Sequence, residues 1–306
     1  MDLNFNFKLE RRHRLVGYSA FAFLAFVLAL RLTIPIEAVK ERIVMEAAAR
    51  GWQVSIASVR SAGLVGVGMT SISLESRDGL RIPIEKVDAT LRLWPLLLGR
   101  RGFDFDAALF DGRVKGFVEE SKTTRRLAAT VTGVDLSRAA PLRKATGLVL
   151  AGTVKGDLDL TLNEKEPAMS AGNLDLAVER AAVNGGEVPV PGMGGALSLP
   201  RIALGRVTAK AVVKDGRLAF ERLEAKGDDV EAAGEGLYLV LQPRLAFAPI
   251  FGKARLVIRD GFWKKSGTSG FKGIVNMALA QARGRDGGYG FQVFGTLSQP
   301  QVRMSP

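Results

Sequence analysis

The sequence predicts a mainly β protein that begins with a single transmembrane helix and a short amphipathic helix. Three observations indicate this class. Residues 15–30 carry no formal charge, the chain after residue 52 alternates repeatedly between apolar and polar residues, and Asp-Gly pairs occur five times. A hydrophobic content of 47% and 35 glycines provide for both a core and many turns.

The predicted transmembrane helix spans residues 15–35. At about 1.5 Å per residue, this length matches a hydrocarbon core of about 30 Å, provided that Arg31 extends its guanidinium to the headgroups. A cleaved signal peptide is the alternative, but no small-x-small cleavage site follows the apolar run. The anchoring side chains are expected to be Leu15, Phe21, Phe23, Leu24, Phe26, Leu28 and Leu30.

The charges that flank this run predict its orientation. The residues before it read KLERRHR, whereas EAVKER, after it, is of mixed sign. Basic residues favour the cytoplasmic side, so 1–14 is a predicted cytoplasmic tail and 52–306 a periplasmic β domain of a single-pass inner-membrane protein, if the cell is Gram-negative. The tail carries +2 of the net charge of +12. The remaining +10 would then face phospholipid headgroups of the membrane or acidic proteins, and not nucleic acid.

An amphipathic helix is predicted for residues 36–51. Pro35 is a suitable helix start, Gly51 a suitable end, and Ile36, Val39 and Ile43 recur at helical spacing. We expect this helix either to lie on the headgroups or to pack across the mouth of the β domain.

The β domain is expected to consist of consecutive antiparallel hairpins. Alternation in segments such as 157–162, 173–178 and 217–223 predicts strands with one apolar and one polar face. Asp-Gly suits two-residue hairpin loops because both positions take positive φ. The segment 93–101, interrupted by Pro95, is predicted to be an apolar turn between two strands.

The residues that could carry chemistry favour a protein without enzymatic activity, metal or cofactor. His13 is the only histidine and belongs to the basic tail, and there is no cysteine, which excludes disulfides, histidine-based triads and thiolate sites. The glycine-rich segments lack the dinucleotide and P-loop patterns. A hydrolase is the alternative. Its carboxylates would come from the pairs Asp104–Asp106, Asp157–Asp159 and Asp228–Asp229, which we interpret as parts of a solvated sheet face.

Two basic segments are candidates for contact with headgroups or with a partner. Arg100 and Arg101 close the apolar turn, and Trp263, Lys264 and Lys265 combine an aromatic ring with positive charge. For 262–265, the alternative is a strand edge protected by its lysines.

Several short motifs, in order, resemble the type II secretion system protein N family and, more distantly, AsmA-like proteins of bacterial envelopes. They are LTIPIEAVKER (32–42), LRLWPLLLGR (91–100), FDGRVKG (110–116) and YGFQVFGTLSQP (289–300). The resemblance implies an elongated, twisted antiparallel sheet, either an open groove or sandwich-like, with no catalytic residues.

The resemblance leaves two functions open. The first is a scaffold or linker of the type II secretion machinery that contacts its inner-membrane platform or its secretin. The second is an AsmA-like protein that binds, transfers or tethers lipid in a β-groove. A fully covered apolar sheet face would exclude the groove, whereas an open one would support it.

Overall fold

The computed structural model describes Tyr18, Phe21 and residues 36–49, 51–63, 65–76, 80–163, 165–189, 196–242, 247–265 and 268–305. The predicted cytoplasmic tail, 1–14, and the predicted transmembrane helix, 15–35, lie outside these residues, apart from Tyr18 and Phe21. Within the described ranges, no helix has both the length and the apolar content needed to cross a membrane.

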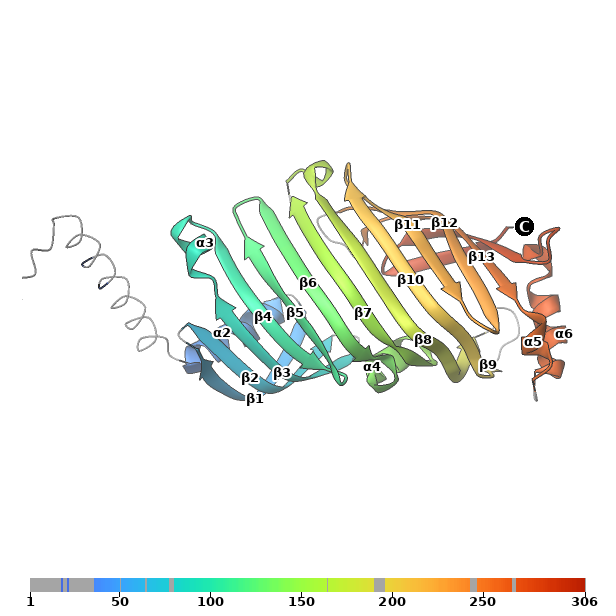
Figure 1. The fold of residues 1–306 in the computed structure, drawn as a ribbon, viewed down its shortest axis with the longest axis horizontal. Helices are drawn as coiled ribbons and strands as arrows, with labels where there is room; N and C mark the ends of the chain where they lie inside the picture. The colour runs from blue at the N-terminus through green and yellow to red at the C-terminus, as the bar shows by residue number, and fades with distance from the viewer. Residues whose placement is uncertain are drawn as a thin grey trace, which may run out of the picture.

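The strands of the described residues form one 15-stranded antiparallel sheet. Neighbours in sequence are neighbours in the sheet, except that β9 pairs with β8 off the main path, so that β8 is followed by β10 (Figure 1). This confirms the prediction of a mainly β fold built from consecutive antiparallel hairpins. The strands are β1 (Trp52–Ala62), β2 (Gly66–Ser76), β3 (Arg81–Leu91), β4 (Arg101–Leu109), β5 (Gly112–Glu120), β6 (Thr124–Asp135), β7 (Leu148–Asn163), β8 (Ala171–Pro189), β9 (Ala196–Leu199), β10 (Ile202–Lys214), β11 (Arg217–Lys226), β12 (Val230–Val240), β13 (Ile250–Ile258), β14 (Tyr289–Thr296) and β15 (Gln299–Met304).

The Asp-Gly pairs have different outcomes. Asp215 and Gly216 join β10 to β11 and both have positive φ, as predicted. Between β4 and β5 the loop is shifted by one residue, to Phe110 and Asp111. The hairpin expected at 260–261 is wrong, because these residues begin the helix α5. The pair at 286–287 lies in the loop before β14, and that at 78–79 lies outside the described residues.

The helices occupy the sheet's ends and turns. Helix α2 confirms that a helix follows residue 35. It packs on β1, where Ile43 contacts the buried cluster Ile56, Met69 and Ile72. At the other end, Val275 of α6 packs with Tyr289 of β14. The α-helices are α2 (Ile36–Ala49), α3 (Leu93–Leu97), α4 (Ala140–Thr146), α5 (Asp260–Trp263) and α6 (Ser269–Ala278).

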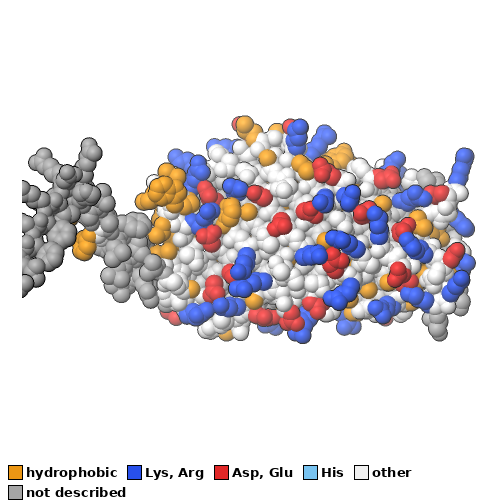
Figure 2. All heavy atoms as spheres, viewed as in Figure 1, with side chains coloured by type: hydrophobic (Ala, Val, Ile, Leu, Met, Phe, Trp, Pro, Cys, Tyr) orange, Lys and Arg blue, Asp and Glu red, His pale blue; other side chains and the backbone are white. Residues whose placement is uncertain are grey.

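The two faces of the sheet differ in chemistry and in curvature. Figure 1 shows a twisted band whose two ends turn behind the central strands. Figure 2, from the same side, shows basic and acidic side chains spread across those strands. The charged face is therefore the convex one, and the apolar residues that alternate with it lie on the concave face, where α2 packs.

Glycines on the concave face permit this curvature. A Cβ at Gly156 would lie 2.0 Å from the backbone oxygen of Asp175, and its φ of +148° is one that other residues rarely adopt. We expect Gly156→Ala to lower the free energy of unfolding by about 1–3 kcal/mol. Chemical denaturation of the full-length protein in mild detergent measures it.

Gly273→Ala is the matched control for this glycine. Gly273 is exposed in α6, and a Cβ there meets no atom within 4 Å. This variant should keep or raise stability, by up to about 1 kcal/mol, because alanine favours helix more than glycine does. Equal losses in both variants would contradict the proposed role of Gly156.

Candidate functional site

The concave face carries continuous apolar rows. The strand register places Met69 of β2 and Phe291 of β14 at the two ends of one row that crosses every strand between them. Its members are Met69, Val87, Ala107, Val114, Val131, Gly156, Leu176, Ala209, Leu223, Gly234, Ala254 and Phe291. A neighbouring row joins Phe105, Gly116, Ala129, Leu158 and Leu174 over β4–β8. We call this surface the apolar face.

Among the described residues, the apolar face is covered at its two ends and only partly covered over its centre. The α2 cluster covers it at β1–β3 and the α6 cluster at β13–β14. Between them, on β4–β7, the large side chains stay only half-buried, among them Leu127, Leu158 and Leu160. Phe103 is 46% exposed. Among the described residues all strands belong to one sheet, so no second sheet covers this face.

At the edge of the sheet that carries α4, strands that are distant in the strand order lie close together. Helix α4, which connects β6 and β7, contacts both β7 and β3, which are four places apart in the strand order. The curl therefore brings the α4 edge close to β3. Towards the C-terminal end, an apolar hollow of about 270 Å³ opens between β10 and β14. Its lining includes Val207, Leu223, Ala225, Leu237, Ile250 and Val293.

The opposite edge, which carries α3, has charged groups at its rim. Arg101, Glu120 and Arg125 pair across β4–β6 on the side of the apolar face, and an Arg125 Nη2 lies 2.8 Å from Glu120 Oε1. Arg100 turns to the charged face, where its Nη1 lies 3.3 Å from Glu119 Oε1. The two predicted contact residues therefore flank the base of α3 on opposite faces.

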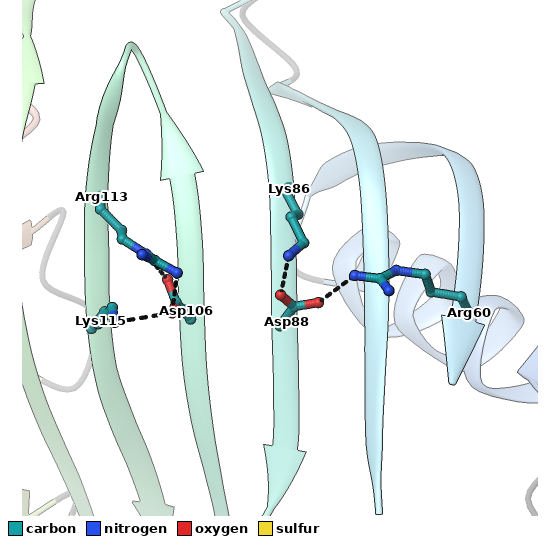
Figure 3. A network of polar contacts seen from close by, with 6 residues as sticks. All are labelled: Arg60, Lys86, Asp88, Asp106, Arg113 and Lys115. Carbon is teal, nitrogen blue, oxygen red and sulfur yellow. Dashed lines mark hydrogen bonds and ion pairs between the residues drawn. The ribbon is translucent and has the colours of Figure 1, made fainter. Parts of the chain in front are cut away.

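On the charged face, carboxylates are held between basic side chains. Asp88 and Asp106 are direct cross-strand neighbours, an arrangement that destabilises unless the charges are compensated. Arg60 and Lys86 contact Asp88, while Arg113 and Lys115 contact Asp106 (Figure 3).

Arg113 holds the second of these carboxylates through two hydrogen bonds, of 2.6 and 2.8 Å. These bonds lower the pKa of Asp106; burial opposes this, and Lys115 supports it. Asp159 is likewise bonded by Arg126, and Asp157 accepts a hydrogen bond from Thr130. The predicted solvated face is thus confirmed for the pairs in β4 and β7.

The third carboxylate pair is different, because Asp229 is only 1% exposed. Its carboxylate accepts hydrogen bonds from the Ala203 N–H, at 2.7 Å, and from Lys265 Nζ, at 2.6 Å. Burial acts to raise the pKa of Asp229, but the hydrogen bonds and the charge of Lys265 outweigh it, so that the pKa is lowered. The prediction that this pair lies on a solvated face is therefore wrong for Asp229. Sequence reasoning missed its partners, Ala203 and Lys265, because they lie 26 and 36 residues away.

The predicted contact segment 263–265 lies in and after α5. Its interpretation as a strand edge is wrong, since 260–263 are helical and Phe262 is buried. Trp263 packs edge-on against Phe262, with ring centroids 5.0 Å apart, and joins the α6 cluster. Lys264 is exposed. The Lys265 ammonium is engaged by Asp229, so it ties α5 to the sheet.

In the part of the chain that the structure describes, no group of three or more His, Asp or Glu side chains is arranged to hold a metal ion. Comparisons with family models, with curated proteins and with solved structures found no match. The fold and this face define a mainly β protein built on a single curled antiparallel sheet with one charged and one apolar face.

Proposed function

We propose that this chain is a non-enzymatic, membrane-anchored envelope protein whose apolar face is an open groove for lipid acyl chains. The observation that carries the proposal is the continuous apolar surface that stays partly exposed between the α2 and α6 clusters. Apolar area of this kind is stabilised by contact with apolar ligands, and monomeric proteins rarely leave large contiguous patches without a function. The groove matches the second function implied by the sequence resemblance.

The dimensions of the groove suit an acyl chain. Strands lie about 4.8 Å apart, so the row from β4 to β8 is about 19 Å long. An acyl chain spans one leaflet, about half of a 30 Å hydrocarbon core. One chain therefore fits along the row. At the β4 end of the row, a headgroup directed towards the α3 edge would meet Arg101, which shares its face with Phe105.

The proposed location follows from the sequence. Residues 15–35 are the proposed inner-membrane anchor, with the basic tail in the cytoplasm and the β domain in the periplasm. Reporter fusions after residue 60 test this topology. Activity of a periplasm-dependent reporter is expected, and activity of a cytoplasm-dependent one would contradict it.

The proposed function is tested by analysing what accompanies the full-length protein out of the membrane. After crosslinking in envelopes and purification in a mild detergent, mass spectrometry should detect stoichiometric phospholipid. Recovery of secretion components without phospholipid would instead favour the scaffold function.

One observation favours this second function. Strand β15 is the terminal strand of the sheet, and all six of its residues are exposed. Its free backbone edge suits strand addition by a partner such as the inner-membrane platform or the secretin of a type II secretion system. Because the chain has no cysteine, a single cysteine at Val302 provides a unique crosslinking site there.

A further inference from the structure

The turn between β3 and β4 presents an apolar apex that the groove does not use. Trp94, Leu97 and Leu98 are 75%, 66% and 64% exposed. Figure 2 shows this cluster as an orange patch at the upper left, at the position of α3 in Figure 1. We define Leu93–Leu98 as the α3 tip.

We propose that the α3 tip inserts into the interface of a lipid bilayer. The inference goes beyond the groove, because insertion of the tip does not depend on lipid in the apolar face. The proposed occupant is the headgroup and upper acyl region of a phospholipid membrane, which tryptophan and leucine favour over water.

The backbone of the tip is suited to an apolar environment, where an unsatisfied polar group is costly. Pro95 contributes no N–H. The N–H groups of Leu98 and Arg100 both bond to the Pro95 oxygen, and that of Gly99 bonds to the Leu96 oxygen. The Arg92 N–H bonds to the Gly102 oxygen and closes the base of the turn.

Basic side chains surround the base of the tip at the level of a headgroup. Arg100 is 56% exposed on the charged face, and Arg101 is exposed on the opposite face. Arg92 is fixed below them by Glu119 and by the ring of Phe117, 4.5 Å from its guanidinium. Arginine in this position reaches phosphates while its stem covers apolar surface.

A hollow beside the tip provides room for a headgroup. It has a volume of about 390 Å³ and is lined by Trp94 and Leu98 together with Arg92, Arg100 and Glu119. Cationic and anionic side chains alternate in it, which complements a phosphate with an attached ammonium group. This composition favours a membrane surface over a purely apolar protein partner.

The position of the tip also favours a membrane. Helices α2 and α3 both lie at the β1 end of the sheet (Figure 1). Because α2 directly follows the proposed anchor, both elements are at the end of the molecule that is tethered nearest to the bilayer. The tip would add a second attachment and limit rotation of the groove about the anchor.

Tryptophan fluorescence of the full-length protein in liposomes tests the insertion. The chain has three tryptophans, so Trp52→Phe with Trp263→Phe leaves only Trp94. The matched control, Trp52→Phe with Trp94→Phe, leaves Trp263 in the α6 cluster. Brominated phosphatidylcholine should quench the fluorescence of the Trp94 protein severalfold more than that of the control. Aqueous iodide should quench the Trp94 protein less in liposomes than in its unfolded state without lipid.

Two further variants separate insertion from misfolding. Leu97→Glu with Leu98→Glu, in the Trp94 background, should abolish quenching by brominated lipid while the far-ultraviolet circular dichroism stays unchanged. Arg100→Gln with Arg101→Gln should reduce the quenching by brominated lipid, and this reduction should be largest at low ionic strength. If iodide quenches Trp94 in liposomes and brominated lipid does not, the proposal is overturned. Protection of Trp94 only in whole envelopes would also overturn it, because it would indicate a protein partner.

Discussion

A glutamate in place of Leu160 is expected to abolish most of the binding of lipid to the groove. Leu160 lies half-buried on the apolar face of β7, two residues inside the rim at Leu162, and is paired with Leu127 and Gly172 on the adjacent strands. Each methylene of an acyl chain that leaves water contributes about 0.8 kcal/mol, so displacing only two of them weakens binding by about tenfold. A desolvated carboxylate adds to this loss.

Thr161→Glu is the matched control, because residue 161 is the next residue of β7 and lies on the charged face opposite Arg126. It should leave lipid binding unchanged. Binding of a fluorescent fatty acid to the full-length protein measures both variants. Equal affinities in Leu160→Glu and wild type, with both proteins folded, would contradict the groove.

The second large effect is expected at the pair formed by the buried Asp229 and the half-exposed Lys265. Lys265→Met leaves a carboxylate that is 1% exposed without its cation. Removal of one partner of a fully buried pair costs about 3–5 kcal/mol, and because solvent reaches Lys265 we expect a loss of about 2–3 kcal/mol. Denaturation midpoints should therefore fall markedly, and Asp229→Asn combined with Lys265→Met should recover part of the loss.

The same pair predicts a pH dependence. The folded protein lowers the pKa of Asp229, so its stabilising contribution is present above the carboxyl's unfolded pKa, about 3.9, and is lost as the pH falls through the folded value. The difference between wild type and Lys265→Met should consequently be large at neutral pH and shrink below about pH 4. A difference that is constant from pH 7 to pH 3 would show that the pair is not the cause.

The sequence predicted the faces of the sheet better than their surroundings. Alternation alone puts Leu158 and Asp159 on opposite faces, because side chains along a strand have a period of two. The same alternation occurs in a covered sandwich and in an open sheet. Which of the two forms depends on long-range curvature, to which close backbone approaches contribute where a glycine such as Gly156 leaves room that a Cβ would fill.

Turns and buried polar groups were the hardest features to predict. Asp-Gly predicts a hairpin at 215–216 correctly and at 260–261 wrongly, because Phe262 is buried by the tertiary fold and draws the second segment into α5. The adjacent aspartates 228 and 229 give no local sign that only the second is buried. Its partners, Ala203 and Lys265, are brought to it by the sheet.

The proposal that the apolar face holds lipid is tested most directly by photocrosslinking in living cells. Asp157 and Leu158 are consecutive residues of β7 that lie on opposite faces, away from the α3 tip; Asp157 is exposed and Leu158 is half-buried. Benzoylphenylalanine at each position in turn, followed by irradiation and mass spectrometry, compares the two faces of one strand. We predict a phospholipid adduct at position 158 and none at 157. Adducts of equal yield at both positions, or protein adducts alone at 158, would contradict the groove.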